Sequence, residues 1–246
     1  MRIPRIYTAS NLHQADNVVL DTKALKHIKD VLRMNAGDCV SLFNGDGYNY
    51  AGTIKELSKK SICIELTDRH KADNESPLYL HLLQPLCRSE KMDWCLQKAT
   101  ELGANEITLY TSSRVNINIP KERLDKKMIH WNSVTQSASE QSGRASIPTI
   151  NPPLAFHDLI SSTNTQEGIK IIASPSAVKN FAEIAQQKYH LCICAIGPEG
   201  GFNDKEIRHA ESHDFFVVQF GPRVLRLETA VISAMTVCQS TWGDLG

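Results

Sequence analysis

The sequence lacks the features that mark membrane, secreted and metal-binding proteins. No apolar run reaches the roughly 18 residues of a membrane-spanning helix. Residues 1–5 include positive charge, but the apolar stretch of a signal peptide does not follow them. The seven cysteines contain no C-x-x-C pair and no zinc-ligand spacing. We therefore expect a cytoplasmic protein with reduced, mostly buried thiols, without a bound metal and without a membrane partner.

The sequence also lacks an excess of charge of either sign. Its 27 Lys and Arg residues equal its 27 Asp and Glu residues, so no overall field indicates a nucleic-acid partner. Residues 114–144 hold six basic residues against three acidic ones, a local excess that suits phosphate. Such a run is more often a solvated helix face.

The residue patterns divide the chain into two parts. A length of 246 residues with 41% hydrophobic content allows one large or two modest domains. Short β-like runs fill residues 18–20, 39–43, 48–57 and 61–67, with one helical pattern over 22–34. The polar segment 69–77 ends in proline and is typical of a linker. We place the domain boundary there, with domains at 1–72 and 73–246.

The second part alternates strands with helices. Strands are predicted over 78–84, 107–110, 169–173, 191–196 and 215–220, and helices over 91–102, 123–141 and 229–241. This alternation predicts an α/β fold with a mostly parallel sheet covered by helices on both faces. The last helix is apolar over more than one face, which fits a subunit interface.

A glycine-rich turn follows the strand over 191–196. Residues 197–201 read GPEGG, and Asn203 and Glu206 resemble a capping pair that starts the next helix. A strand, a glycine turn and a helix N-terminus favour a nucleotide-like site at the carboxyl edge of a sheet, although an ordinary tight turn has the same pattern. The glycine spacing excludes the dinucleotide and P-loop motifs.

A second segment, FGPRVLRLETA over 220–230, again joins a strand end to a turn and a helix that opens near residue 229. The two strand ends are expected to face one crevice. Arg226 and Glu228 lie in this loop beside two leucines, which suits an aromatic ligand and a charged pair. A solvated salt bridge is the alternative interpretation.

Together, GPEGG and FGPRVLRLETA resemble the bacterial ribosomal RNA N3-uridine methyltransferases of the SPOUT superfamily. The stretches QKATELG (97–103), EQSGR (140–144) and HIKDVLRMNAGD (27–38) extend the resemblance over almost the entire chain. The sequence departs from the family at Ser113, where a glutamate usually precedes the arginine, so the resemblance assigns no acid at this position.

The resemblance implies a small N-terminal PUA-like β-barrel that binds RNA and a C-terminal α/β domain threaded into a deep trefoil knot. It also implies that three loops bind S-adenosylmethionine, with S-adenosylhomocysteine as the product. Carried over to this chain, the donor-binding residues are Ser174, Pro175, Ile196, Gly197, Pro198, Glu199, Gly200, Gly201, Phe220, Gly221, Leu225 and Leu227.

The implied reaction is methylation of N3 of one uridine in the 16S RNA of the small ribosomal subunit. We assign Arg226 to stabilise the uracil anion and Glu228 to act as the base or to orient that arginine. Candidate phosphate contacts are Arg33, Arg114 and Arg144, each equally well explained as a surface or salt-bridged arginine. A homodimer through the C-terminal domain is the family expectation.

Two rival functions stay open. A ribose 2′-O-methyltransferase of the same superfamily would have the same donor pocket, but it typically carries Ser-Leu-Asn where this chain has residues 226–228. A non-catalytic RNA-binding assembly factor would keep only a vestigial pocket, and the intact 197–201 turn argues against it. Of the remaining polar residues, His27 is expected to be structural, whereas Glu140 and Gln141 either border a pocket or cap a helix.

Overall fold

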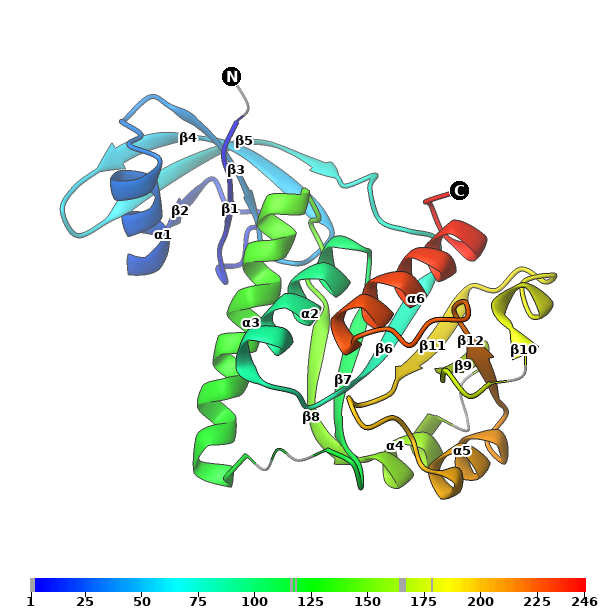
Figure 1. Cartoon of the computed structure of the whole chain (residues 1–246). Coiled ribbons are helices and arrows are strands. Elements are labelled where there is room, and N and C mark those ends of the chain that lie inside the picture. The colour runs from blue at the N-terminus through cyan, green and yellow to red at the C-terminus, as the bar shows by residue number, and fades with distance from the viewer. Residues whose placement is uncertain (1–2, 116, 118, 164–166, 178) are drawn as a thin grey trace. The chain divides into compact units, whose positions relative to one another are not determined.

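The computed structural model describes residues 3–115, 117, 119–163, 167–177 and 179–246. The chain forms two compact units (Figure 1). The first unit contains Met1–Glu75 and Gln136–Ile147, and the second contains Ser76–Thr135 and Pro148–Gly246. Helix α3 (Lys121–Ser142) therefore begins in the second unit and ends in the first, a division that the local sequence pattern does not reveal.

The first unit is a five-stranded sheet with the order β1-β3-β4-β5-β2. Its strands are β1 (Arg5–Tyr7), β2 (Asn17–Val19), β3 (Cys39–Phe43), β4 (Tyr48–Leu57) and β5 (Ile62–Lys71). All neighbouring strands are antiparallel except β1 and β3. Side chains of β4 alternate between buried and less buried positions up to Ile54, because successive residues face opposite sides of a sheet. The β-rich first domain is confirmed.

Two expectations for the first unit need correction. The segment 69–77 is not a linker throughout, since residues 69–71 continue β5 and pair with residues 48–50 of β4. The Arg69 guanidinium also lies 5.4 Å from the ring centre of Tyr48, which helps hold this polar end in the sheet. The helix predicted over 22–34 is shorter, because α1 (Thr22–Lys26) continues as a π-helical turn that ends at Val31.

The second unit is a seven-stranded parallel sheet with the order β10-β12-β9-β11-β6-β7-β8. Its strands are β6 (Tyr79–Pro85), β7 (Glu106–Thr111), β8 (Thr149–Ala155), β9 (Ile169–Ala173), β10 (Lys179–Asn180), β11 (Leu191–Ile196) and β12 (Phe215–Gln219). The sequence did not predict β8, which contains Pro152 and Pro153. A strand at the edge of a sheet tolerates proline because one of its sides needs no backbone donors.

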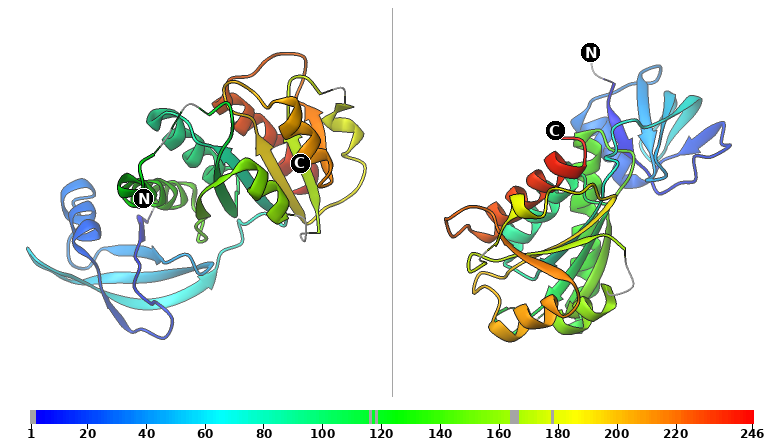
Figure 2. Two further views of the ribbon diagram at one scale, coloured as in Figure 1. Left: turned by 90° about the horizontal axis from the view of Figure 1, so that it is seen from below. Right: turned by 90° about the vertical axis from the view of Figure 1, so that its right-hand side faces the viewer.

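Helices cover both faces of this sheet (Figure 2). Along β11, Cys192 and Cys194 pack into one core with α2 (Ser89–Glu101), α3 and α6 (Leu227–Trp242). Ile193 and Ala195 pack into the opposite core with α4 (Phe156–Ser162) and α5 (Asp204–Glu211). Burial on both sides explains the uninterrupted apolar sequence of β11. The predicted α/β architecture is confirmed.

None of the helices in the described parts of the chain combines the length and the apolar character needed to cross a membrane. All seven cysteines are free thiols, of which five are buried and Cys39 is exposed. In the second-unit core, the Cys192 and Cys238 sulfurs lie 3.7 Å apart. Burial raises the pKa of the Cys192 thiol, so this thiol stays protonated at neutral pH.

Candidate functional site

A cavity of about 400 Å³ lies at the carboxyl edge of the parallel sheet, where β9, β11 and β12 end. These strands are neighbours in the order β12-β9-β11. The residues that follow them, within 173–175, 196–202 and 220–227, line the cavity. Parallel α/β sheets bind ligands at this edge because their loops converge there. We call this space the donor cavity, because the sequence resemblance predicts the binding site of the methyl donor here.

Glycines shape the turn after β11. The Gly201 amide donates a hydrogen bond to the Pro198 carbonyl at 2.8 Å, and Gly201 has a φ of +68°, which glycine adopts without a side-chain clash. A Cβ atom added at Gly197 would lie 3.1 Å from the Phe202 ring. The turn therefore depends on glycine for two reasons, the positive φ at Gly201 and the lack of space for a side chain at Gly197.

Aromatic side chains pack against the same turn. The Tyr110 hydroxyl donates to the Ile196 carbonyl, and the Tyr110 ring stacks on Phe202 with 6.5 Å between centroids. The turn then leads directly into α5, where the Asn203 side chain accepts from the Glu206 amide at 2.9 Å and the Glu206 carboxylate accepts from the Asn203 amide at 2.9 Å. The predicted capping pair is confirmed and fixes where the turn ends.

The loops after β9 and β12 complete the wall. The Ser174 amide donates to the Val218 carbonyl at 3.0 Å, which ties the end of β9 to β12. Phe220 packs against Phe181 with ring centroids 5.4 Å apart. Helix α6 begins at Leu227, two residues earlier than predicted, so Arg226 is its N-cap residue. The structure brings together all the predicted donor-binding residues except Gly200, which lines an adjacent cavity.

The structure separates the predicted catalytic pair. Arg226 is exposed and lines the donor cavity. Glu228 lies in the first turn of α6 and does not line it. Its Oε2 atom is buried and has no hydrogen-bond partner among the described residues. The Glu228 carboxylate lies 3.9 Å from the ammonium of Lys91, which does line the cavity.

Lys91 is a site residue that sequence reasoning missed. It lines the donor cavity from the first turn of α2, donates to Glu199 Oε1, and its Nζ lies 3.9 Å from Glu228 Oε2. The hydrogen bond and the opposite charge raise the pKa of Lys91 and lower the pKa of Glu199. No local signal reveals this contact, because 108 residues separate Lys91 from Glu199.

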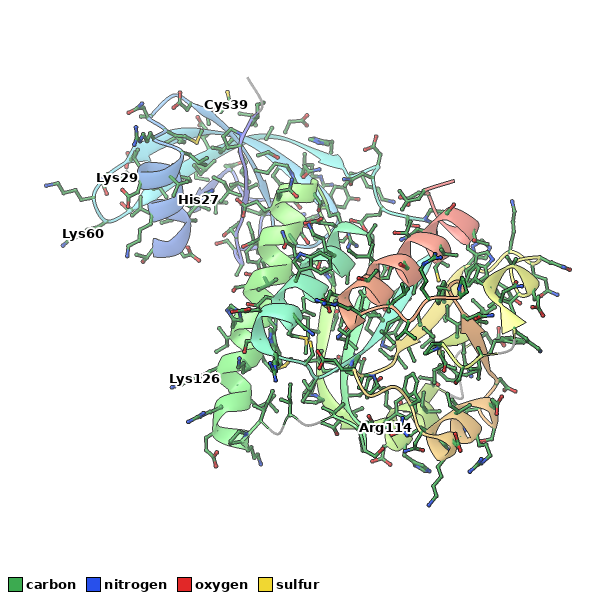
Figure 3. All side chains as sticks on the ribbon, viewed as in Figure 1. His27, Lys29, Cys39, Lys60, Arg114 and Lys126 are labelled. Atoms are coloured by element: carbon green, nitrogen blue, oxygen red, sulfur yellow. The ribbon has the colours of Figure 1, made fainter. Side chains whose placement is uncertain are left out.

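The three candidate RNA-binding arginines have different environments. Arg33 is exposed and has a φ of +54°. Arg114, labelled in Figure 3, is exposed after β7, and its Nη1 donates to the carbonyls of Gly200 at 2.8 Å and Phe202 at 3.3 Å. Beside it, Ser113 contacts the Glu206 carboxylate at 3.2 Å through its amide and its hydroxyl.

Arg144 requires a correction, because it is only 4% exposed. Its Nη2 lies 2.7 Å from Glu75 Oε2, and its Nε lies 3.1 Å from Glu75 Oε1. Its carbonyl also accepts a hydrogen bond from Arg5 at 3.0 Å. A buried arginine that is paired with a carboxylate cannot turn to phosphate without leaving that charge uncompensated. Arg144 therefore holds the first unit together.

In the parts of the chain that the structure describes, no group of three or more His, Cys, Asp or Glu side chains is placed to bind a metal ion. The donor cavity is instead lined by backbone, by apolar side chains and by a few charged groups. Such a mixture suits an organic ligand with an apolar ring and polar ends.

Two family models match the chain. Residues 74–239 match the RNA methyltransferase domain, and residues 20–67 match the RNA methyltransferase PUA domain. A Ribosomal RNA small subunit methyltransferase E of Buchnera aphidicola from Schizaphis graminum is 38% identical over 245 residues, covering 99% of this chain and 98% of that protein. The Bacillus subtilis protein of the same name is 25% identical over 93% of this chain and 92% of its own length.

Solved structures give the same result. A methyltransferase of Legionella pneumophila in complex with the cofactor S-adenosylmethionine is 35% identical with a TM-score of 0.92. A Ribosomal RNA small subunit methyltransferase E of Neisseria gonorrhoeae bound to S-adenosylmethionine is 30% identical with a TM-score of 0.91. Both comparisons cover 100% of each chain. With its PUA and RNA methyltransferase domains, the chain belongs to the ribosomal RNA small subunit methyltransferase E family.

Proposed function

We propose that this protein uses S-adenosylmethionine to methylate N3 of a uridine in the 16S RNA of the small ribosomal subunit. The observation that carries the proposal is the convergence of three loops from neighbouring parallel strands on one cavity of about 400 Å³. This volume is in the range of small-molecule and cofactor sites. Two related structures contain S-adenosylmethionine, which supports this molecule as the ligand of the cavity. The names of the full-length relatives support small-subunit ribosomal RNA as the substrate.

The residues that line the donor cavity fit this cofactor. Ile196, Leu225 and Leu227 offer apolar surface to the adenine ring, and the glycine turn at 197–201 lets backbone groups approach its polar edge. Glu199 and Lys91 offer charged groups to the cationic and zwitterionic parts of the molecule. When bound, S-adenosylmethionine supplies an electrophilic methyl group, so the protein needs to position the acceptor and to favour its anionic form.

Arg226 is the residue we propose to favour that anion. Uracil N3 is an imide nitrogen between two carbonyls, and it becomes nucleophilic when its proton leaves and charge spreads onto O2 and O4. A guanidinium on the cavity wall stabilises this charge electrostatically. We propose that Glu228, whose carboxylate lies 3.9 Å from the Lys91 ammonium, acts as the base or orients Arg226. If Glu228 only orients Arg226, the proton leaves to solvent.

The acceptor nucleotide must be accessible on its pairing edge. N3 takes part in base pairing, so the target uridine is unpaired or flipped out of a helix. We propose that residues 1–72 form the RNA-binding PUA domain and residues 73–246 the methyltransferase domain. Arg33 and Arg114, both exposed, are the proposed phosphate contacts. The knot that the resemblance implies stays a prediction.

We further propose a cytoplasmic homodimer. The face of α6 that packs inside its own unit includes Val231, Ala234, Met235 and Cys238. Ile232 on the same helix remains partly exposed and is therefore available to a partner. Sedimentation or light scattering at micromolar concentration measures the mass, and a monomer would contradict the dimer while leaving the proposed reaction intact.

A direct experiment tests the reaction. The purified protein is incubated with labelled S-adenosylmethionine and small ribosomal subunits from a strain without the enzyme, and the modified nucleoside is identified by mass spectrometry. We expect one N3-methyluridine per subunit. A methyl group on ribose would establish 2′-O-methylation instead. A protein that binds RNA but shows no heat of binding with S-adenosylmethionine would be a non-catalytic assembly factor.

A further inference from the structure

A second cavity, of about 450 Å³, adjoins the donor cavity. The two cavities share Pro198, Glu199 and Leu227 as lining residues. A transfer between two bound molecules requires two spaces in contact, because the reacting atoms must come within about 3–3.5 Å of each other. The shared wall makes the second cavity the natural space for the molecule that receives the group.

The second cavity has the chemistry of a nucleotide site. Leu86, Cys87 and Val115 give it apolar surface, and Arg88 and Arg114 give it two cations. The apolar part of this wall suits a flat pyrimidine ring, and guanidinium groups bind phosphate through paired N–H donors. Among the described residues, Glu199 is the one carboxylate on its wall, and its charge is compensated by the Lys91 ammonium and, more weakly, by Arg88.

Both arginines have guanidinium N–H groups that can donate to a ligand. The Arg88 side chain makes no hydrogen bond or ion pair with another described residue, and it is exposed. Arg114 uses Nη1 to hold the carbonyls of Gly200 and Phe202, which leaves Nη2 and Nε for a ligand. The contact with Gly200 also fixes Arg114 against the glycine turn that divides the two cavities. Arg114 is thus partly preorganised for a ligand at this position.

Helix N-termini add to the positive potential. Arg88 and Arg226 are the N-cap residues of α2 and α6, and neither helix has a side-chain cap at this end. The ends lie next to each other, since Lys91 in the first turn of α2 is 3.9 Å from Glu228 in the first turn of α6. Uncapped amides and the helix dipoles favour an anion beside them.

We propose that this second cavity is the acceptor subsite, which takes one unpaired pyrimidine nucleotide of the RNA, with Arg88 and Arg114 binding its phosphate. This inference rests on the proposed RNA methyltransferase function and adds the place of the acceptor and two residues that hold it. Arg226 lines the donor cavity, and the next residue, Leu227, lines both cavities, so the proposed role of Arg226 requires the uracil edge to reach the wall that the two cavities share. The competing assignment is that the same arginines bind the carboxylate of S-adenosylmethionine. The two assignments differ in which ligand loses affinity when an arginine is replaced.

The test uses the Arg88→Gln and Arg114→Gln variants of the full chain, with Lys188→Gln as the control for the loss of one exposed charge. Calorimetry measures the Kd for S-adenosylmethionine, and initial rates measure the KM for small subunits at several salt concentrations. We expect a KM at least about tenfold higher for each arginine variant and a salt dependence shallower by about one counterion. The Kd for S-adenosylmethionine should stay unchanged in Arg88→Gln, whereas Arg114→Gln also removes the hydrogen bonds that hold the glycine turn and should weaken cofactor binding as well. Lys188→Gln should behave as the unchanged protein does.

Arg88→Gln is the decisive variant, because the Arg88 side chain makes no hydrogen bond or ion pair with another described residue. If its Kd for S-adenosylmethionine rises by the same factor as its KM for small subunits, Arg88 binds the cofactor. If its KM is unchanged, Arg88 does not belong to the acceptor subsite. A protein that methylates no RNA before any substitution would contradict the proposed function instead. Val115→Trp supplies an independent test, since added bulk in the second cavity should block methylation while donor binding persists.

Discussion

The two units each contain a large cavity, and the larger one is not the proposed reaction centre. The first-unit cavity, of about 840 Å³, is lined by residues from 3–7, 21–32 and 136–141. Some of its charged groups already have partners, because Arg5 donates to the carbonyls of Ser139 and Glu140 and His27 lies 3.6 Å from Glu140. Glu140 and Gln141 thus border this cavity and not the donor cavity.

The donor cavity in the second unit has half that volume but a different construction. Three loops from neighbouring parallel strands converge on it, and uncapped helix ends and unpaired N–H donors lie beside it. The first-unit sheet is mainly antiparallel and has no such edge, because alternating strands end on opposite sides. Topology, and not size, therefore identifies the place where a ligand meets converging groups.

We expect the largest effect from the substitution Arg226→Ala, which tests whether the donor cavity is the reaction centre. Removing the cation that favours the uracil anion should lower kcat by about 10²–10³ while the Kd for S-adenosylmethionine changes little. Rates with small subunits and calorimetry with the donor measure the two effects. The matched variant in the first-unit cavity is Gln136→Ala, for which we expect an unchanged kcat. A loss of kcat in Gln136→Ala with normal Arg226→Ala turnover would reverse the assignment of the two cavities.

The next effect concerns the glycine turn. In Gly197→Val a branched side chain would meet the Phe202 ring, since its Cβ alone lies 3.1 Å away. Overpacking of this kind costs about 1–3 kcal/mol, so donor affinity should weaken about ten- to hundredfold. Ser137→Val adds comparable bulk to an exposed position of the first-unit cavity and should leave the donor Kd unchanged. If the unchanged protein, Gly197→Val and Ser137→Val bind S-adenosylmethionine with the same Kd, the glycine turn does not pack tightly against the cofactor.

A smaller effect is expected from Lys91→Met. In the unchanged protein the pKa of Lys91 is raised and that of Glu199 is lowered, so both groups stay charged from mildly acidic to mildly basic pH. Without the ammonium, the pKa of Glu199 should return toward its ordinary value, and the acidic limb of the kcat/KM profile should move to higher pH. Since the pair is partly exposed, we expect only about a two- to fivefold loss at neutral pH. Lys91→Arg should restore the profile, and a profile unaffected by Lys91→Met would deny the pair a role.

The smallest effect concerns the stability of the second-unit sheet. His81 is 4% exposed in β6, and burial lowers its pKa below the ordinary 6.5 despite the nearby Glu106 carboxylate. The unfolded chain therefore binds a proton more readily than the folded one, and the stability present above pH 6.5 is lost as the pH falls through the lowered pKa. Urea unfolding at neutral and acidic pH measures this loss. His81→Gln should reduce the difference, and an identical difference in both proteins would exclude His81 as its source.

The sequence by itself determined most of the local structure. Strands β3, β4, β9 and β11 begin and end where their apolar patterns predicted. Whether one or both faces of a strand are buried determines the order of apolar and polar residues within that strand, so the sequence shows it directly. The GPEGG turn and its capping pair were predictable for the same reason, since each depends on contacts within a few residues. The resemblance then supplied most of the residues that line the donor cavity, although not Lys91, Phe202 or Ala230.

Only the tertiary structure decided the long-range features. It brought Lys91 to Glu199 across 108 residues, buried Arg144 against Glu75, and assigned the end of α3 to the first unit. It also left Glu228 out of the lining of the donor cavity and formed a second cavity beside that cavity. Charged side chains have no fixed partner in the local pattern, and their contacts arise when strand order and helix packing bring distant segments together.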